Sequence, residues 1–118
     1  MVLCWTSKNR FSDYMYRVKI TVVKKFTPKD VIGRDYIRPE SGKPIPPCHL
    51  QEGQEFLFTE TGQMPQDFCP NAWYGIFNEV SLLTCGGSYP DWTGKDTIYA
   101  TCPDGIRPVI FRLDRIKT

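Results

Sequence analysis

The sequence lacks the features that direct a chain to a membrane. None of its apolar stretches approaches the ~20 residues that a membrane-spanning helix needs. The first residues also lack the cationic start and apolar core of a signal peptide. These absences predict a cytoplasmic protein with no membrane partner.

The sequence also has little net charge and a single histidine. The formal charge is only +2 over 118 residues, and the basic side chains are dispersed, so we expect no nucleic-acid partner. No Gly-rich phosphate loop or dinucleotide-binding fingerprint occurs. His49 is the only histidine, and no nucleophile elbow surrounds it, which excludes a Ser/His/Asp triad.

What the chain does have is enough apolar material for one core. Hydrophobic residues make up 41% of the sequence and aromatic residues 14%, and the length fits a single domain. Residues 1–14 show no hydrophobic period, so we interpret them as an N-terminal extension. Residues 15–118 are predicted to form one domain that begins at Met15.

The clearest local pattern is a hairpin near the end of the chain. Pro103-Asp104-Gly105 has the composition of a tight turn between two strands. Side chains alternate between the faces of a strand, so one apolar row is expected to face the core. That row comprises Ile98, Ala100, Cys102, Val109, Phe111 and Leu113.

Four further segments complete the predicted elements: a strand over 16–26, a short helix over 28–35, a strand over 55–59, and a long helix. Thr27 fits the N-cap of the short helix. The long helix begins at Cys69-Pro70 and ends before Gly86-Gly87. One face of it is marked by Trp73, Ile76, Phe77, Val80 and Leu83. This order predicts an α+β fold: an antiparallel or mixed sheet of about four strands, covered by one long amphipathic helix plus a short helix.

Five cysteines are many for a chain of this length, and the number is odd. Disulfides are not expected in a reducing cytoplasm. Cys4 lies in the predicted extension, so we treat it as unconnected to any site. Cys85 is interpreted as a small buried hydrophobic residue.

The other three cysteines each adjoin a proline at an element boundary. Cys48 follows a proline-rich loop, Cys69 starts the long helix, and Cys102 precedes the hairpin turn. We predict that these corners bring the three sulfur atoms together as ligands of zinc or an iron–sulfur cluster. Cys85, His49 or an external ligand would be the fourth donor. The chain has no Cys-x-x-Cys pair, so it matches neither zinc-ribbon nor ferredoxin spacing.

The same residues allow two readings without a metal. In one, Cys69 is the nucleophile of a thiol enzyme, with Asp104 and Arg107 as polar partners. Arg107 would bind an anion by paired hydrogen bonds. In the other, the three cysteines are ordinary buried residues, and Asp104 is only a turn residue.

A third class of function is a binding module for a small-molecule ligand. Trp73, Tyr74, Tyr89 and Trp92 are its candidate contact residues, and the last two lie in a loop rich in turn-forming residues. Open sheet edges favour self-association, so a homo-oligomer is also predicted.

Several segments between Tyr16 and Ile116 are distinctive. The most specific are Phe-Cys-x-x-Ala-Trp at 68–73 and Cys-x-Asp-Gly-x-Arg-Pro-Val at 102–109. These segments resemble a family of small uncharacterised microbial proteins. The resemblance implies that Cys48, Cys69 and Cys102 are the positions the family shares, and that Cys4, Cys85 and the arm before Met15 are particular to this chain. It identifies positions and carries no established activity.

Overall fold

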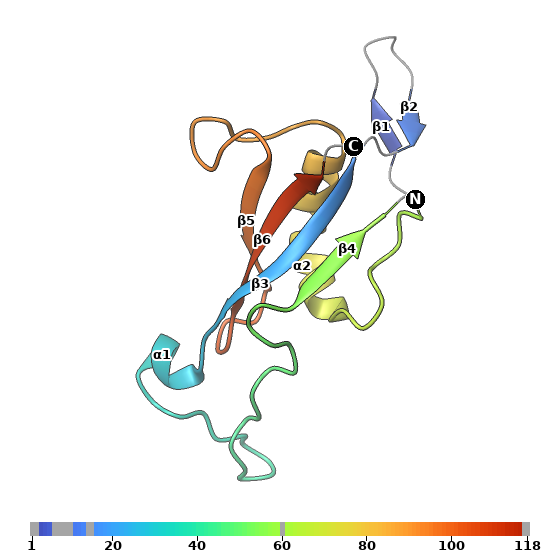
Figure 1. The fold of residues 1–118 in the computed structure, drawn as a ribbon. Helices are drawn as coiled ribbons and strands as arrows, with labels where there is room; N and C mark the ends of the chain where they lie inside the picture. Colours follow the sequence, from blue (N-terminus) through green and yellow to red (C-terminus); the bar gives the residue numbers. More distant parts are fainter. Residues whose placement is uncertain (1–2, 6–10, 14–15, 60, 117–118) are drawn as a thin grey trace.

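The computed structural model describes residues 3–5, 11–13, 16–59 and 61–116, and it has the predicted α+β architecture (Figure 1). The main sheet is wholly antiparallel, with strand order β4-β3-β6-β5. Helix α2 lies across one face of it. Short helix α1 follows β3. The bounds are β3 Arg17–Lys25, α1 Pro28–Ile32, β4 Glu55–Phe58, α2 Pro70–Thr84, β5 Thr97–Thr101 and β6 Val109–Ile116. Among the described residues, no helix is long and apolar enough to cross a membrane.

The core follows from the alternation of apolar residues along the strands. In β3, Ile20 is fully buried and lies opposite Phe56 of β4 and Leu113 of β6. The predicted hairpin is confirmed, with Ile98 of β5 opposite Leu113 of β6 and Ala100 opposite Phe111, but residues 102–108 form a longer connection than the predicted tight turn. The sheet and α2 thus bury one continuous core: Val18, Ile20, Val22, Phe56, Phe58, Ala72, Ile76, Val80, Leu83, Ile98, Val109, Phe111 and Leu113.

The predicted caps are confirmed, and the predicted face of α2 is wrong at one residue. Thr27 accepts from Asp30 N–H, and the Asp30 side chain accepts from Thr27 N–H, which together form a capping box. Phe77 is 37% exposed, whereas Ala72 is buried. The buried stripe of α2 is centred on Ile76 and Val80, which puts Phe77 at its border.

Helix α2 approaches the β5–β6 hairpin closely at Gly75. A Cβ atom at this position would lie 2.7 Å from Pro103 Cδ and 3.2 Å from the Thr101 carbonyl oxygen. Both neighbours belong to the backbone or to a rigid ring, so they cannot move aside cheaply. Glycine therefore lets the first half of α2 lie directly against the hairpin.

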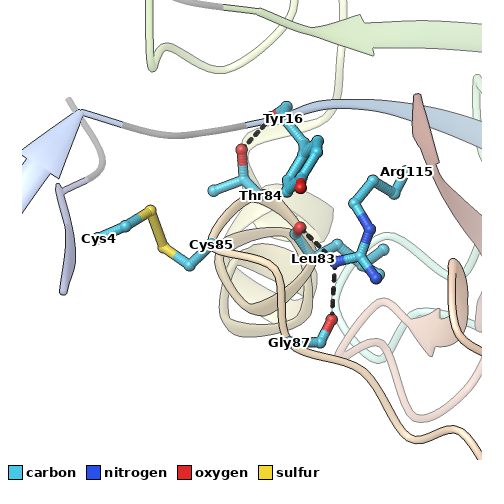
Figure 2. Close-up of a disulfide and its surroundings, with 7 residues drawn as sticks. All are labelled: Cys4, Tyr16, Leu83, Thr84, Cys85, Gly87 and Arg115. Carbon is cyan, nitrogen blue, oxygen red and sulfur yellow. Dashed lines mark hydrogen bonds between the residues drawn. A yellow bond between two sulfur atoms is a disulfide. The ribbon is translucent and has the colours of Figure 1, made fainter. Parts of the chain in front are cut away.

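The predicted extension contains two paired strands, β1 (Leu3–Trp5) and β2 (Phe11–Asp13), set apart from the main sheet (Figure 1). The rest of the extension, and the predicted domain start at Met15, lie outside the described residues. Cys4 in β1 is disulfide-bonded to Cys85, 81 residues away in the sequence (Figure 2). The expectations of no disulfide, an unconnected Cys4 and a merely buried Cys85 are therefore wrong. The pairing of Cys4 with Cys85 depends on how the end of α2 packs against the extension. No local sequence pattern predicts this packing.

The C-terminal end of α2 is held by a buried arginine as well as by the disulfide. Arg115 of β6 donates from Nη1 to the carbonyl oxygens of Leu83 at 2.8 Å and Gly87 at 2.9 Å (Figure 2). Its guanidinium carbon lies 5.3 Å from the centroid of the Tyr16 ring. Thr84 Oγ1 donates to the Tyr16 carbonyl oxygen. A cation at this end is favourable, because the last carbonyl groups of a helix have no partner within the helix.

The Gly75→Ala variant tests the close approach of α2. A methyl group against Pro103 adds an overpacking cost of about 1–3 kcal/mol, while alanine gains up to about 1 kcal/mol of helix propensity over glycine. We expect a net loss of about 1 kcal/mol or more in the free energy of unfolding, measured by urea denaturation. Gly105→Ala is the matched control: a Cβ there meets nothing within 4 Å, so its stability should stay within about 0.5 kcal/mol. Equal stability of the two variants would contradict the close approach.

Removal of the disulfide is expected to destabilise the fold strongly. Its long loop of 81 residues corresponds to a loss of about 2–4 kcal/mol in the free energy of unfolding. The measurement is urea denaturation of the wild type with and without a reductant. The Cys4→Ser/Cys85→Ser double variant should match the reduced wild type and show no response to the reductant. A wild type that does not respond either would show that the bond makes no contribution.

Candidate functional site

The three remaining cysteines line one pocket of about 290 Å³. Cys48 comes from the loop before β4, Cys69 from the start of α2, and Cys102 from the end of β5. Asp104 and Arg107, from the β5–β6 connection, line the same pocket. We call this hollow the thiol pocket. All five residues singled out from the sequence thus lie around one cavity, although their functional roles stay predictions.

Cys48 is positioned by two cations that hold carbonyl groups of its loop. Lys25 Nζ donates to the Cys48 carbonyl oxygen at 2.7 Å, and Arg107 Nη1 donates to the Pro46 carbonyl oxygen at 2.5 Å. Proline has no backbone N–H, so within residues 44–47 only Ile45 donates a backbone hydrogen bond, to the Tyr36 carbonyl oxygen at 3.1 Å. Carbonyl groups of the loop also accept from side chains at the end of β3 and beyond the hairpin turn.

Cys69 is the N-cap residue of α2, and its side chain makes no capping hydrogen bond. The preceding Phe68 anchors it, since the Phe68 ring packs against Phe56 at 4.8 Å and Phe111 at 5.4 Å between centroids. Asn71 and Ala72 of the first helical turn also line the pocket. The first turn of α2 carries no acidic residue, and the carboxylate that lines the pocket, Asp104, comes from the β5–β6 connection.

Cys102 is buried and closes the hairpin by a reciprocal pair of contacts with Val109. The Cys102 N–H donates to the Val109 carbonyl oxygen at 3.1 Å, and the Val109 N–H donates to Cys102 Sγ at 3.3 Å. This contact is suited to a sulfur atom that binds a metal or an electrophile.

Asp104 organises the turn and orients Arg107. Its Oδ1 accepts from the N–H groups of Ile106 at 2.9 Å and Arg107 at 3.0 Å, and its Oδ2 accepts from Arg107 Nε at 3.1 Å. Burial opposes ionisation of this carboxyl group. The hydrogen bonds from Ile106 and Arg107, together with the Arg107 charge, outweigh burial and lower the pKa of Asp104 below 3.8. Asp104 is therefore both a turn residue and the partner that aims Arg107.

The options for a fourth donor separate clearly. His49 lines the thiol pocket beside Cys48. Cys85 is bonded to Cys4 at the opposite end of α2. The prediction that Cys85 is a possible fourth ligand is therefore wrong for this disulfide-bonded form.

Sequence reasoning missed two residues near the thiol pocket, Lys25 and Asn71. A lysine at the end of a strand carries no local signal that it holds a distant carbonyl group, whereas Asn71 was within reach of inference because it follows the helix-starting Cys69-Pro70.

The aromatic residues proposed for a binding module do not gather at the thiol pocket. Trp73 packs beside Phe58 and Phe68 at the border of the core. Tyr74 and Trp92 are highly exposed, and Tyr89 lies against Trp92 with ring centroids 5.8 Å apart. None of the four lines the thiol pocket.

Within the described ranges, no three His, Cys, Asp or Glu side chains form a group already arranged to hold a metal ion. Comparison of the chain with protein-family models, with curated proteins and with solved structures finds no match. The resemblance noted from the sequence therefore stays a prediction, and the function has to be argued from the pocket itself.

Asp104 should give the stability a defined pH dependence. Its pKa is lower in the folded state, so ionised Asp104 stabilises the fold above its unfolded value near 3.8, and this contribution is lost as the pH falls through the lower native value. Asp104→Asn is expected to lower the free energy of unfolding by about 1 kcal/mol at pH 7, with the difference from wild type shrinking below pH 4. Urea denaturation across pH measures it. Asp91→Asn, at an exposed residue outside the pocket, should stay within about 0.5 kcal/mol. A difference that grows at low pH would contradict the assignment.

Proposed function

We propose that this protein binds a thiophilic metal, as zinc or an iron–sulfur cluster, through Cys48, Cys69 and Cys102. The observation that carries the proposal is that three free thiols, from segments 21 and 33 residues apart in sequence, line one pocket. Soft sulfur donors select zinc, copper(I) or iron–sulfur clusters over hard cations. Three protein ligands would leave one position for His49 or an external ligand.

The surroundings of the sulfur atoms suit this donor set. The Val109 N–H reaches the Cys102 sulfur, as outer-shell donors do at thiolate sites. The Arg107 guanidinium lies in the same pocket but is paired with the Asp104 carboxylate, whereas the start of α2 brings partial positive charge with no acidic residue in its first turn. When bound, the metal would supply a Lewis acid or a redox centre, while Arg107 would orient a ligand beside it.

A second candidate is a metal-free thiol site that binds or transforms an anion. The orientation of Arg107 by Asp104 favours it, because a fixed guanidinium recognises carboxylate or phosphate groups geometrically. Here Cys69 is the nucleophile at the start of α2, Arg107 holds the substrate anion, and Asp104 keeps Arg107 in place. This candidate uses the same pocket and needs no additional residue.

We infer that the function operates in the cytoplasm, where a reducing environment keeps the three pocket thiols free. The Cys4–Cys85 disulfide favours an oxidising compartment instead, because such bonds persist best there. The disulfide lies at the far end of α2 and involves none of the three pocket cysteines, which are free thiols.

Metal analysis of anaerobically purified protein tests the proposal. We expect about one zinc ion or one iron–sulfur cluster per chain, the cluster being recognised by charge-transfer absorption in the visible range. Substitution of Cys48, Cys69 or Cys102 by Ser should each lower the metal content severalfold, because thiolate is the ligand that the metal requires. The Cys4→Ser/Cys85→Ser double variant is the matched control and should retain the metal.

The metal proposal would be overturned if the purified protein contained no metal and still bound none after reconstitution with zinc or with iron and sulfide. Rapid alkylation of Cys69 alone in that protein, abolished by Cys69→Ser, would support the thiol-enzyme candidate. Slow alkylation of all three pocket cysteines would contradict both candidates.

A further inference from the structure

A second pocket, of about 230 Å³, adjoins the thiol pocket and shares three of its residues, Pro47, Cys48 and Arg107. Apart from Arg107, its charged lining residues are Lys25 and Asp35. The other lining is mostly apolar, from Phe26, Pro28, Ile45 and Pro46. Each pocket alone falls below the roughly 300–1,000 Å³ typical of small-molecule sites, whereas the two together lie within that range. A ligand that extends past Arg107 from one pocket into the other would fill a volume within this range.

Arg107 has hydrogen-bond donors left over for such a ligand. An arginine side chain carries five N–H donors. Nε donates to Asp104 and Nη1 to the Pro46 carbonyl oxygen, and within the part of the chain that the structure describes nothing accepts from Nη2. The guanidinium is thus fixed in place with unused donors at the boundary between the pockets. Asp104 already pairs with Nε, so a single further anionic group is the ligand that the unused Nη2 donors would recognise.

The charges around the apolar pocket determine where that anion can lie. The Lys25 ammonium group is already engaged by the Cys48 carbonyl oxygen at 2.7 Å. Lys25 keeps its positive charge and Asp35 adds a negative one, so the two charges offset each other, and most of the remaining lining is apolar. The ligand portion in this pocket must therefore be uncharged and apolar.

We propose that the site takes a small monoanion with an apolar tail, of the chemical class of a medium-chain carboxylate. The carboxylate lies on Arg107 at the mouth of the thiol pocket, and the tail lies among Phe26, Pro28 and Ile45. This inference rests on the proposed function only in taking the thiol pocket as the functional site. It names the substrate class and holds for either candidate chemistry.

The test is an NMR titration of the full chain with acetate, butyrate and hexanoate. The backbone amide signals of Phe26 and Ile45 report binding. Burial of each added methylene should tighten binding about three- to fourfold. Equal affinity for acetate and hexanoate would overturn the proposal, because the apolar pocket would then be unused.

Two pairs of variants locate the two ends of the ligand. Arg107→Met should weaken binding of all three carboxylates about tenfold or more, since it removes a charge-assisted contact. Arg112→Met makes the same change outside both pockets and should leave affinity unchanged. Ile45→Asn should abolish the dependence on chain length, whereas Ile37→Asn, in the same loop but outside both pockets, should preserve it. Arg107 also donates to the Pro46 carbonyl oxygen, so Arg107→Met can unfold the loop. In that case Ile45→Asn still tests whether the tail of the ligand lies in the apolar pocket.

Metal content measured on the same samples separates this inference from the proposed function. Hexanoate binding by a metal-free protein would support the inference and overturn the metal proposal. A metal-loaded protein that binds none of the carboxylates would overturn the inference alone.

Discussion

The seating of helix α2 against the β5–β6 hairpin is the contact on which the rest of the molecule depends. It requires glycine at position 75, because any larger residue would collide with Pro103. The contact joins α2, which begins directly after Cys69, to Thr101 and Pro103 on either side of Cys102, so it ties together the segments that carry these two cysteines. The opposite end of α2 is fixed by the Cys4–Cys85 disulfide and by Arg115. The helix thus has free thiols at its N-terminal end and a disulfide at its C-terminal end.

The third corner of the thiol pocket is built on a different principle. The loop before β4 combines backbone hydrogen bonds, such as that from the Ile45 N–H to the Tyr36 carbonyl oxygen, with side chains that reach its carbonyl groups. Arg107 serves two purposes here, because it holds Pro46 and also lines both pockets. Asp104 links these purposes, since it shapes the hairpin turn and fixes the guanidinium. The order of the loop and the lining of both pockets are therefore coupled through one arginine.

Most of the fold could be predicted because its signals are local. Alternation identified the strands, and Thr27 and the Cys69-Pro70 pair identified where the helices begin. The predictions failed where the decisive contact is distant in sequence. Phe77 lies on an apolar stripe by spacing, yet the sheet covers a slightly different sector of α2. Cys4 gave no sign of its partner, because a bond over 81 residues depends on where the chain returns.

For the candidate site, the residues alone determined the list of Cys48, Cys69, Cys102, Asp104 and Arg107, because proline-bounded corners and a tight turn are encoded by their immediate neighbours. Only the tertiary structure decided that these residues surround one cavity, that Cys85 belongs to a disulfide, and that an apolar pocket adjoins Arg107. The physical reason is that side-chain chemistry and turn geometry are local properties. The volume enclosed between a helix, a hairpin and a loop depends on how all three pack together.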